Sequence, residues 1–286
     1  MNRTVDRVIP ARRASDGDGV KLWRSIGATQ AIRHDPFLLL DEISSDQAAD
    51  YIGGFPAHPH RGFETITYML EGYMQHKDHM GNVGLLKPGG AQWMTAAHGI
   101  IHEEIPQQEQ GTMHGFQLWL NLPSAEKMKP AWYRDIEPTE VGDAAFPGGL
   151  LRLVSGHVNV AGVEVAGPIN TPDAPVTTDP IIAEIRLDSG GRLQLPLASQ
   201  YNAFIYVFEG DLMIQGNSYK PQSALILSEG DELELSSTDG GRVLLLAGLP
   251  IGEPVVQRGP FVMNTPEELD QAMKDYANGT LTQEPN

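Results

Sequence analysis

The sequence predicts an all-β fold of sandwich or barrel type, divided into two domains and followed by one C-terminal helix. Three observations predict it. Short apolar runs recur between turn residues along a chain with 31 Gly and 21 Pro among its 286 residues, which is typical of sandwiches and barrels. A strand-and-turn segment occurs twice, as YMLEG at Tyr68–Gly72 and as YVFEG at Tyr206–Gly210. The length of the chain suits two cores of ordinary size.

Three segments of the first half have the pattern of strands. Residues 20–26 follow the turn cluster DGDG at 16–19, and residues 66–70 lead into the turn at Glu71-Gly72. In the segment FQLWLN at 116–121, Phe and Leu side chains alternate with Gln, Trp and Asn. That alternation has the period of two that a strand requires.

A proline-rich segment separates the two halves. Residues 123–147 hold four prolines among charged residues, which predicts a linker. We therefore expect an N-terminal domain over residues 1–135 and a C-terminal domain over residues 145–286. In the C-terminal half the strand pattern returns five times, over 181–187, 193–197, 202–208, 224–227 and 242–246.

One helix is predicted, over residues 265–278. Thr265 suits the N-cap, Pro266 suits the first helical position, and Glu268 stands at the capping-box spacing. Asn278-Gly279 provides the stop. The apolar stripe along this helix predicts a packing face, and we assign it no chemistry.

The composition excludes several classes of function. The chain has no cysteine, which excludes disulfides, thiolate catalysis and cysteine-ligated metals. A formal net charge of −17 disfavours direct binding to nucleic acid or to anionic membranes. No apolar run has the length of a membrane helix, and the N-terminus lacks the apolar core of a secretory signal. We therefore expect a cytoplasmic location.

Histidine is concentrated in one part of the chain. Eight of the nine histidines lie between His34 and His114. Two of them form His58-Pro59-His60, and a second pair of metal-binding side chains follows at His102-Glu103-Glu104. Residues i and i+2 of a strand point to the same face, so two neighbouring strands would bring three imidazoles and a carboxylate together. No such cluster recurs at the second copy of the repeat, where an offset of 138 turns His58 and His60 into Pro196 and Ala198.

A site of neutral imidazoles with one carboxylate suits iron, manganese, cobalt, nickel or zinc. Four protein ligands on a six-coordinate ion leave two positions open, whereas zinc would form a closed four-ligand site. Strand alternation places Glu104, not Glu103, on the face of His102, so we favour Glu104 as the carboxylate ligand. A carboxylate in this position is also a candidate general base for a substrate hydroxyl.

Other polar side chains nearby have weaker claims to the site. Glu64 could be a fifth ligand, a carboxylate that orients an imidazole, or a surface residue; the last two are favoured. We interpret His76, His79 and His98 as surface or loop-anchoring histidines. His114 is a candidate for the mouth of the site.

Several longer motifs surround these residues, and together they resemble the pirin family of bicupins. They extend from the N-terminal region to the predicted helix, so the resemblance covers nearly the whole chain. The motifs are HPHRGFET at 58–65 with YMLEG at 68–72, QWMTA at 92–96 with GIIHEE at 99–104, DPFLLLDE at 35–42, QLWLNLP at 117–123 and GPFVMNT at 259–265.

The resemblance implies two tandem cupin β-barrels of the jelly-roll kind, ending in a helix, with metal only in the first. The family's ligands correspond to His58, His60, His102 and Glu104, which agrees with the argument from strand faces. The implied metal is Fe(II), with Mn, Co, Ni, Cu and Zn as alternatives. In ordinary cupins a histidine lies five residues after the proline of the second motif, and that position is Trp93 here. His98 stands where pirins often carry arginine or another residue.

The resemblance implies two competing functions. The first is a quercetin 2,3-dioxygenase-type oxidoreductase, which cleaves a flavonol with dioxygen and uses Glu104 as the proton acceptor. The second is a redox- or metal-sensing regulatory protein that acts through a protein partner without substrate turnover. A third interpretation, an isomerase or zinc hydrolase, would use the same ligands for Lewis-acid chemistry.

Overall fold

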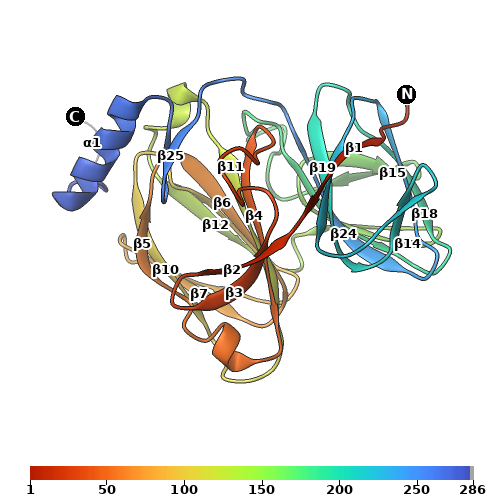
Figure 1. The fold of residues 1–286 in the computed structure, drawn as a ribbon, viewed down its shortest axis with the longest axis horizontal. Coiled ribbons are helices and arrows are strands. Elements are labelled where there is room, and N and C mark those ends of the chain that lie inside the picture. Colours follow the sequence, from red (N-terminus) through yellow and green to blue (C-terminus); the bar gives the residue numbers. More distant parts are fainter. Residues whose placement is uncertain (284–286) are drawn as a thin grey trace. The chain divides into compact units, whose positions relative to one another are not determined.

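The computed structural model describes residues 1–283 and confirms the all-β prediction (Figure 1). Most elements are strands, and one α-helix, α1 (Pro266–Ala277), lies near the C-terminus. The chain divides into two compact units. We call the unit of Arg13–Arg33, Phe37–Pro138 and the chain from Ile251 onward the histidine barrel. The unit of Met1–Arg12, His34–Pro36 and Thr139–Pro250 is the aliphatic barrel.

The histidine barrel consists of a seven-stranded and a four-stranded sheet. The larger sheet has the order β12-β9-β6-β11-β4-β3-β2 and the smaller the order β5-β10-β7-β8. Side chains from both sheets share one core, which includes Leu22, Met69 and Met113 from the larger sheet and Phe55 and Met74 from the smaller. The bounds are β2 (Arg12–Asp16), β3 (Val20–Arg24), β4 (Phe37–Ser45), β5 (Phe55–His60), β6 (Phe63–Glu71), β7 (Met74–Asp78), β8 (Val83–Leu86), β9 (Ala91–Thr95), β10 (Ile100–Pro106), β11 (Met113–Asn121) and β12 (Trp132–Ile136).

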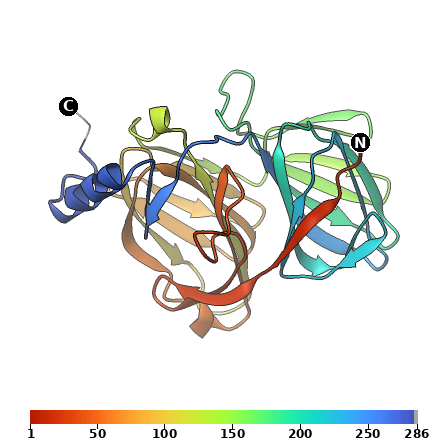
Figure 2. The same ribbon diagram turned by 45° about the horizontal axis from the view of Figure 1, so that its top comes forward.

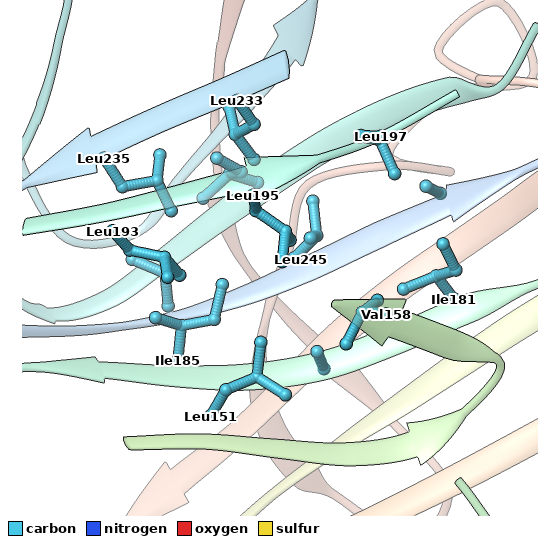
Figure 3. Packing of buried hydrophobic residues seen from close by; sticks show 14 of the residues in the cluster. Leu151, Val158, Ile181, Ile185, Leu193, Leu195, Leu197, Leu233, Leu235 and Leu245 are labelled. Carbon is cyan, nitrogen blue, oxygen red and sulfur yellow. The ribbon is translucent and has the colours of Figure 1, made fainter. Parts of the chain in front are cut away.

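The aliphatic barrel repeats this architecture. Its sheets have the orders β1-β22-β19-β24-β17-β14-β13 and β18-β23-β20-β21, and a hairpin of β15 and β16 is added. The interior is filled by aliphatic side chains from both sheets (Figure 3). The bounds are β1 (Val5–Pro10), β13 (Gly142–Phe146), β14 (Gly149–Ser155), β15 (His157–Val160), β16 (Val163–Ala166), β17 (Ile181–Leu187), β18 (Arg192–Pro196), β19 (Asn202–Gly210), β20 (Leu212–Ile214), β21 (Asn217–Tyr219), β22 (Ser223–Leu227), β23 (Glu232–Ser236) and β24 (Gly241–Gly248).

The repeated sequence segment marks equivalent strands of the two barrels. YMLEG ends β6 and YVFEG ends β19, and each of these strands is third in the order of its seven-stranded sheet. The equivalence fails one strand earlier, because Pro196 and Ala198 are exposed while Leu193, Leu195 and Leu197 are buried in the barrel (Figure 3). The offset of 138 residues therefore aligned His58 and His60 with exposed residues at and just beyond the end of β18. A shift of one residue exchanges the two faces of a strand.

Both ends of the chain depart from the division expected from sequence. Strand β1 pairs with β22 of the aliphatic barrel, with Val8 opposite Leu225 (Figure 2). At the other end, β25 (Val256–Arg258), β26 (Phe261–Met263) and α1 belong to the histidine barrel, where α1 contacts β26. The sequence pattern of a single strand does not encode such long-range pairings. The predicted limits of 1–135 and 145–286 therefore assign β1, and the segment from β25 to α1, to the wrong unit.

The predicted linker was too long. Within 123–147, β12 pairs with β9 in the histidine barrel and β13 pairs with β14 in the aliphatic barrel. The helix agrees closely with its prediction, since Thr265 forms a capping box with Glu268 and Asn278 is the C-cap. Within residues 1–283, no helix has the length and apolar content needed to cross a membrane.

Candidate metal centre

Two neighbouring strands of the four-stranded sheet hold the predicted ligands. Strands β5 and β10 are antiparallel, and His102 lies directly opposite His58. His60 ends β5, and Gly62 then turns the chain into β6 with a φ of +91°. A Cβ atom at Gly62 would lie 1.9 Å from the carbonyl oxygen of Val262. Glycine is therefore required where β26 passes the end of β5.

Three imidazoles meet at this point. The Nε2 atoms of His58 and His60 lie 3.0 Å apart. The ring centroid of His102 is 4.4 Å from that of His58 and 4.9 Å from that of His60. One nitrogen from each ring lies within 4.8 Å of the other two, a spacing that allows a single ion to bind all three. His60 and His102 are buried, and His58 is half-buried.

Glu104 contacts a histidine that the sequence did not reveal as a site residue. Strand β7 pairs with β10 so that His76 lies opposite Glu104. The Nε2 atom of His76 is 3.4 Å from Oε1 of Glu104. His76, His102 and Glu104 form a second group whose ligating atoms lie within 4.8 Å of one another. The four predicted ligands are thus divided between two overlapping groups that share His102.

The imidazoles of His60, His76 and His102 are in the protonation state that binds metal ions. Burial lowers the pKa of His60 and of His102 well below the usual value, and neighbouring histidines lower both further. Burial also lowers the pKa of His76. At neutral pH these rings are therefore uncharged and present lone pairs. The Nδ1 atom of His58 lies 2.8 Å from the carbonyl oxygen of Pro56, so Nδ1 carries the proton and Nε2 is free to bind.

Several buried ring nitrogens have no hydrogen-bond partner. Among the described residues, neither nitrogen of His102 has one. Buried polar atoms are nearly always paired in folded proteins, because an unpaired one costs about 1–3 kcal/mol. A divalent metal ion would provide the missing partner for His102. The donor set of imidazoles and a carboxylate therefore fits such an ion.

The carboxylate of Glu104 is held by polar side chains of the opposite sheet. Gln117 Nε2 donates to Oε2 over 2.8 Å, and Thr67 Oγ1 donates to Oε1 over 3.3 Å. Trp119 Nε1 in turn donates to Gln117 Oε1 over 3.3 Å. The alternation along the strand places Gln117 and Trp119 on one face but gives Gln117 no role. The contact depends on the packing of two sheets, which the alternation within one strand does not encode.

The remaining acidic candidates lie outside both groups. Glu103 points away from Glu104 and forms an ion pair with Lys77, with 3.2 Å between Nζ and Oε1, as strand alternation predicted. Glu64 is buried rather than on the surface. Its Oε1 accepts a hydrogen bond of 2.5 Å from Thr95 Oγ1, and burial raises its pKa.

The other histidines are anchored elsewhere. His98 Nδ1 lies 3.1 Å from the carbonyl oxygen of Lys129, and His114 Nε2 lies 3.0 Å from Glu42 Oε1. His79 Nδ1 accepts from the backbone N–H of Ile101. The interpretation of His76 as a surface or loop histidine was wrong. It occupies an inward position of β7, and only 4% of its surface is exposed.

A cavity of about 460 Å³ opens beside the imidazoles, within the histidine barrel. This volume lies in the range of small-molecule sites, roughly 300–1,000 Å³. His58, His60 and Gln117 contribute to one part of its wall. Apolar side chains contribute another part, and they are Leu39, Phe55, Trp119 and Pro260. Trp119 also packs edge-on against His60, with ring centroids 5.4 Å apart.

Comparison with known families identifies the chain. Residues 19–120 match the model of the Pirin family, and residues 182–282 match that of the Pirin C-terminal cupin domain. The chain belongs to the pirin family. Both barrels are therefore cupin domains, as the sequence motifs implied.

Relatives of this pirin carry names that refer to flavonol oxidation. A protein from Pseudomonas aeruginosa named "Putative quercetin 2,3-dioxygenase" is 50% identical over 272 residues, which cover 94% of each chain. The crystal structure of a quercetin 2,3-dioxygenase from Acinetobacter baumannii superposes with a TM-score of 0.87 at 31% identity, covering 98% of this chain and 99% of that one.

A more distant structure shares the fold. The structure titled as a bacterial pirin from Escherichia coli in complex with nickel(II) has a TM-score of 0.65 at 20% identity, and the match covers 85% of this chain and 98% of that one.

Proposed function

We propose that this pirin is an Fe(II)-dependent dioxygenase that cleaves flavonols such as quercetin. One observation carries the proposal: His58 and His60, which meet the buried ring of His102 that has no hydrogen-bond partner, line a cavity of small-molecule size with aromatic side chains in its wall. The names of the relatives from Pseudomonas aeruginosa and Acinetobacter baumannii support this reaction. The proposed ligands are His58, His60, His102 and Glu104.

The two overlapping groups bear on the choice of ligands. His58, His60 and His102 provide three nitrogens within reach of one position, and His102 brings Glu104 close to it. His76 then contacts the carboxylate from β7, as outer partners of metal ligands commonly do. A redox-active divalent metal bound there would supply the electron-transfer chemistry that allows dioxygen to react with an aromatic ring.

Protein side chains position the substrate and accept its proton. Trp119, Leu39 and Phe55 line the cavity, and we expect a flat aromatic ring system to pack against these side chains. We assign Glu104 as the acceptor of the proton from the flavonol hydroxyl. Gln117 lines the cavity and donates to Glu104, so it fixes the orientation of this carboxylate relative to the substrate.

The proposal is tested by dioxygen uptake. Protein loaded with Fe(II) under anaerobic conditions should consume dioxygen and quercetin in equal amounts after mixing. His60→Ala should abolish this consumption and lower the metal content found by elemental analysis. The matched control is His157→Ala, which removes an exposed histidine of the aliphatic barrel and should change neither value.

A zinc-loaded sample separates binding from turnover. Zinc has no redox chemistry, so this sample should bind quercetin without consuming dioxygen. Equal consumption by the Fe(II)-loaded wild type and His60→Ala would overturn the assignment. Quercetin consumption by the zinc form without dioxygen would indicate Lewis-acid chemistry instead.

A further inference from the structure

The cavity beside the imidazoles contains an arginine that lacks a carboxylate partner. Arg33 lines this cavity, and its Nη2 donates to Oε1 of Gln257 over 2.6 Å. Its Nε atom is buried and has no hydrogen-bond partner, and within residues 1–283 the side chain forms no ion pair. A guanidinium has five N–H donors, and the hydrogen bond from Nη2 to Gln257 uses one of them.

The second arginine of the wall provides a contrast. Arg24 donates to both carboxylate oxygens of Asp41, with Nε–Oδ1 and Nη2–Oδ2 distances of 2.7 and 2.6 Å. It also pairs with Asp16 over 2.8 Å. Asp16 is the acidic residue of the cavity lining, and Arg24 already engages it. The charge of Arg24 is thus neutralised within the protein, while the charge of Arg33 is not.

An arginine left without a counter-ion in a partly buried position has an energetic cost. Moving a charged group out of water is unfavourable unless a partner compensates for the lost hydration. The net charge of this chain is −17, so carboxylates that could have paired with Arg33 are abundant. An anionic group on the ligand of the cavity would provide the missing partner.

We propose that Arg33 binds an anionic group of the substrate, and that the cavity therefore selects flavonols or related aromatic hydroxy compounds that carry a carboxylate. This inference rests on the proposed function, because it assigns the substrate class of the same cavity. The guanidinium presents several donors in one plane, which matches the geometry of a carboxylate. The hydroxyl end of such a compound would lie toward His58 and His60, and the carboxylate toward Arg33.

Two matched probes test the inference: 3-hydroxyflavone and 3-hydroxyflavone-4′-carboxylate. Their dissociation constants are measured by calorimetry on the zinc-loaded protein, so that no turnover occurs. Wild type should bind the carboxylate about 10-fold more tightly, the lower end of what a hydrogen bond to a charged group provides. Arg33→Gln should remove this preference and leave the affinity for 3-hydroxyflavone nearly unchanged.

Three further variants separate charge from structure. Arg192→Gln, which changes an exposed arginine of the aliphatic barrel, should keep the full preference and serves as the control. Arg33→Lys should keep part of it, because the charge remains. Gln257→Leu removes the hydrogen bond but not the charge of Arg33, so the preference should persist.

The possible failures differ from one another. If wild type binds both probes equally and Arg33→Gln changes nothing, the role of Arg33 is wrong while the flavonol function stands. An equal loss of preference in Gln257→Leu and Arg33→Gln would also overturn it, because the hydrogen bond rather than the charge would then matter. If wild type binds neither probe, both the flavonol function and the inference fail.

Discussion

A buried lysine next to the candidate metal centre leads to a prediction about stability. Only 1% of the surface of Lys127 is exposed. Its Nζ donates to the carbonyl oxygens of Gly62 and Val262, over 2.6 and 3.1 Å, and to Oδ1 of Asn121 over 2.7 Å. This ammonium therefore joins the turn that follows His60, the end of β11 and strand β26. We predict that Lys127→Met removes a specific pH dependence from the free energy of unfolding.

The magnitude follows from the pKa of Lys127. Burial lowers this pKa from 10.5 to about 8. Between these values the unfolded chain binds more protons than the folded one, so the free energy of unfolding rises with pH through this window. For a pKa of about 8 in the folded state, the rise from about pH 7.5 to about pH 9.5 is about 2 kcal/mol. The hydrogen bonds of Nζ are a separate contribution, and their loss should destabilise the variant by a few kcal/mol at neutral pH.

Urea denaturation followed by tryptophan fluorescence measures this effect. All four tryptophans, Trp23, Trp93, Trp119 and Trp132, lie in the histidine barrel, so their signal reports the unit that contains Lys127. Lys129→Met is the matched control, since Lys129 is partly exposed and pairs with Glu126. Wild type and this control should become more stable with rising pH, whereas Lys127→Met should not. Parallel pH profiles of Lys127→Met and wild type would contradict this prediction.

Three further predictions concern the candidate metal centre and an ion pair next to it. Glu104→Gln should lower dioxygen consumption with quercetin by roughly 10²–10⁴-fold, the usual contribution of a general base, and elemental analysis will show how much metal is retained. His76→Leu should weaken metal binding by about 10–100-fold in chelator competition, as expected for a partner of a ligand, while His79→Leu should not. Arg61→Met breaks a mostly buried ion pair of 2.6 Å with Asp275 and should destabilise the histidine barrel by roughly 2–4 kcal/mol in urea.

Local rules were enough to predict much of the fold and which side chains come together at the candidate centre. Strand alternation separated Glu104, which is buried, from Glu103, which pairs with Lys77. The capping box at Thr265 and Glu268 located the helix. Each of these features depends on side chains within a few residues of one another, so it can be predicted from the sequence alone.

The lengths of the connections between strands determine which face of a strand points inward, and local rules do not predict them. Strand β5 ends at His60 and β6 begins at Phe63, whereas β18 ends at Pro196 and β19 begins only at Asn202. The longer connection in the aliphatic barrel changes the register relative to the repeated motif. Leucines thus occupy the inward face of β18, although the motif offset aligned Pro196 and Ala198 with His58 and His60. Repeats aligned on one strand do not fix the faces of the next when the connections differ in length.

His76 shows why the environment of a ligand is harder to predict than the ligand itself. Its neighbours Gln75 and Lys77 are partly or fully exposed, while Met74 and His76 are buried, so the alternation of a strand was present in the sequence. The polar residues around it gave the segment the composition of a surface loop, and that composition was misleading. What makes His76 relevant is the pairing of β7 with β10, which sets it opposite Glu104. Glu104 is thus contacted by His76 from β7 and held by Gln117 from β11. In the proposed reaction, the ability of Glu104 to accept a proton would therefore depend on residues from two other strands.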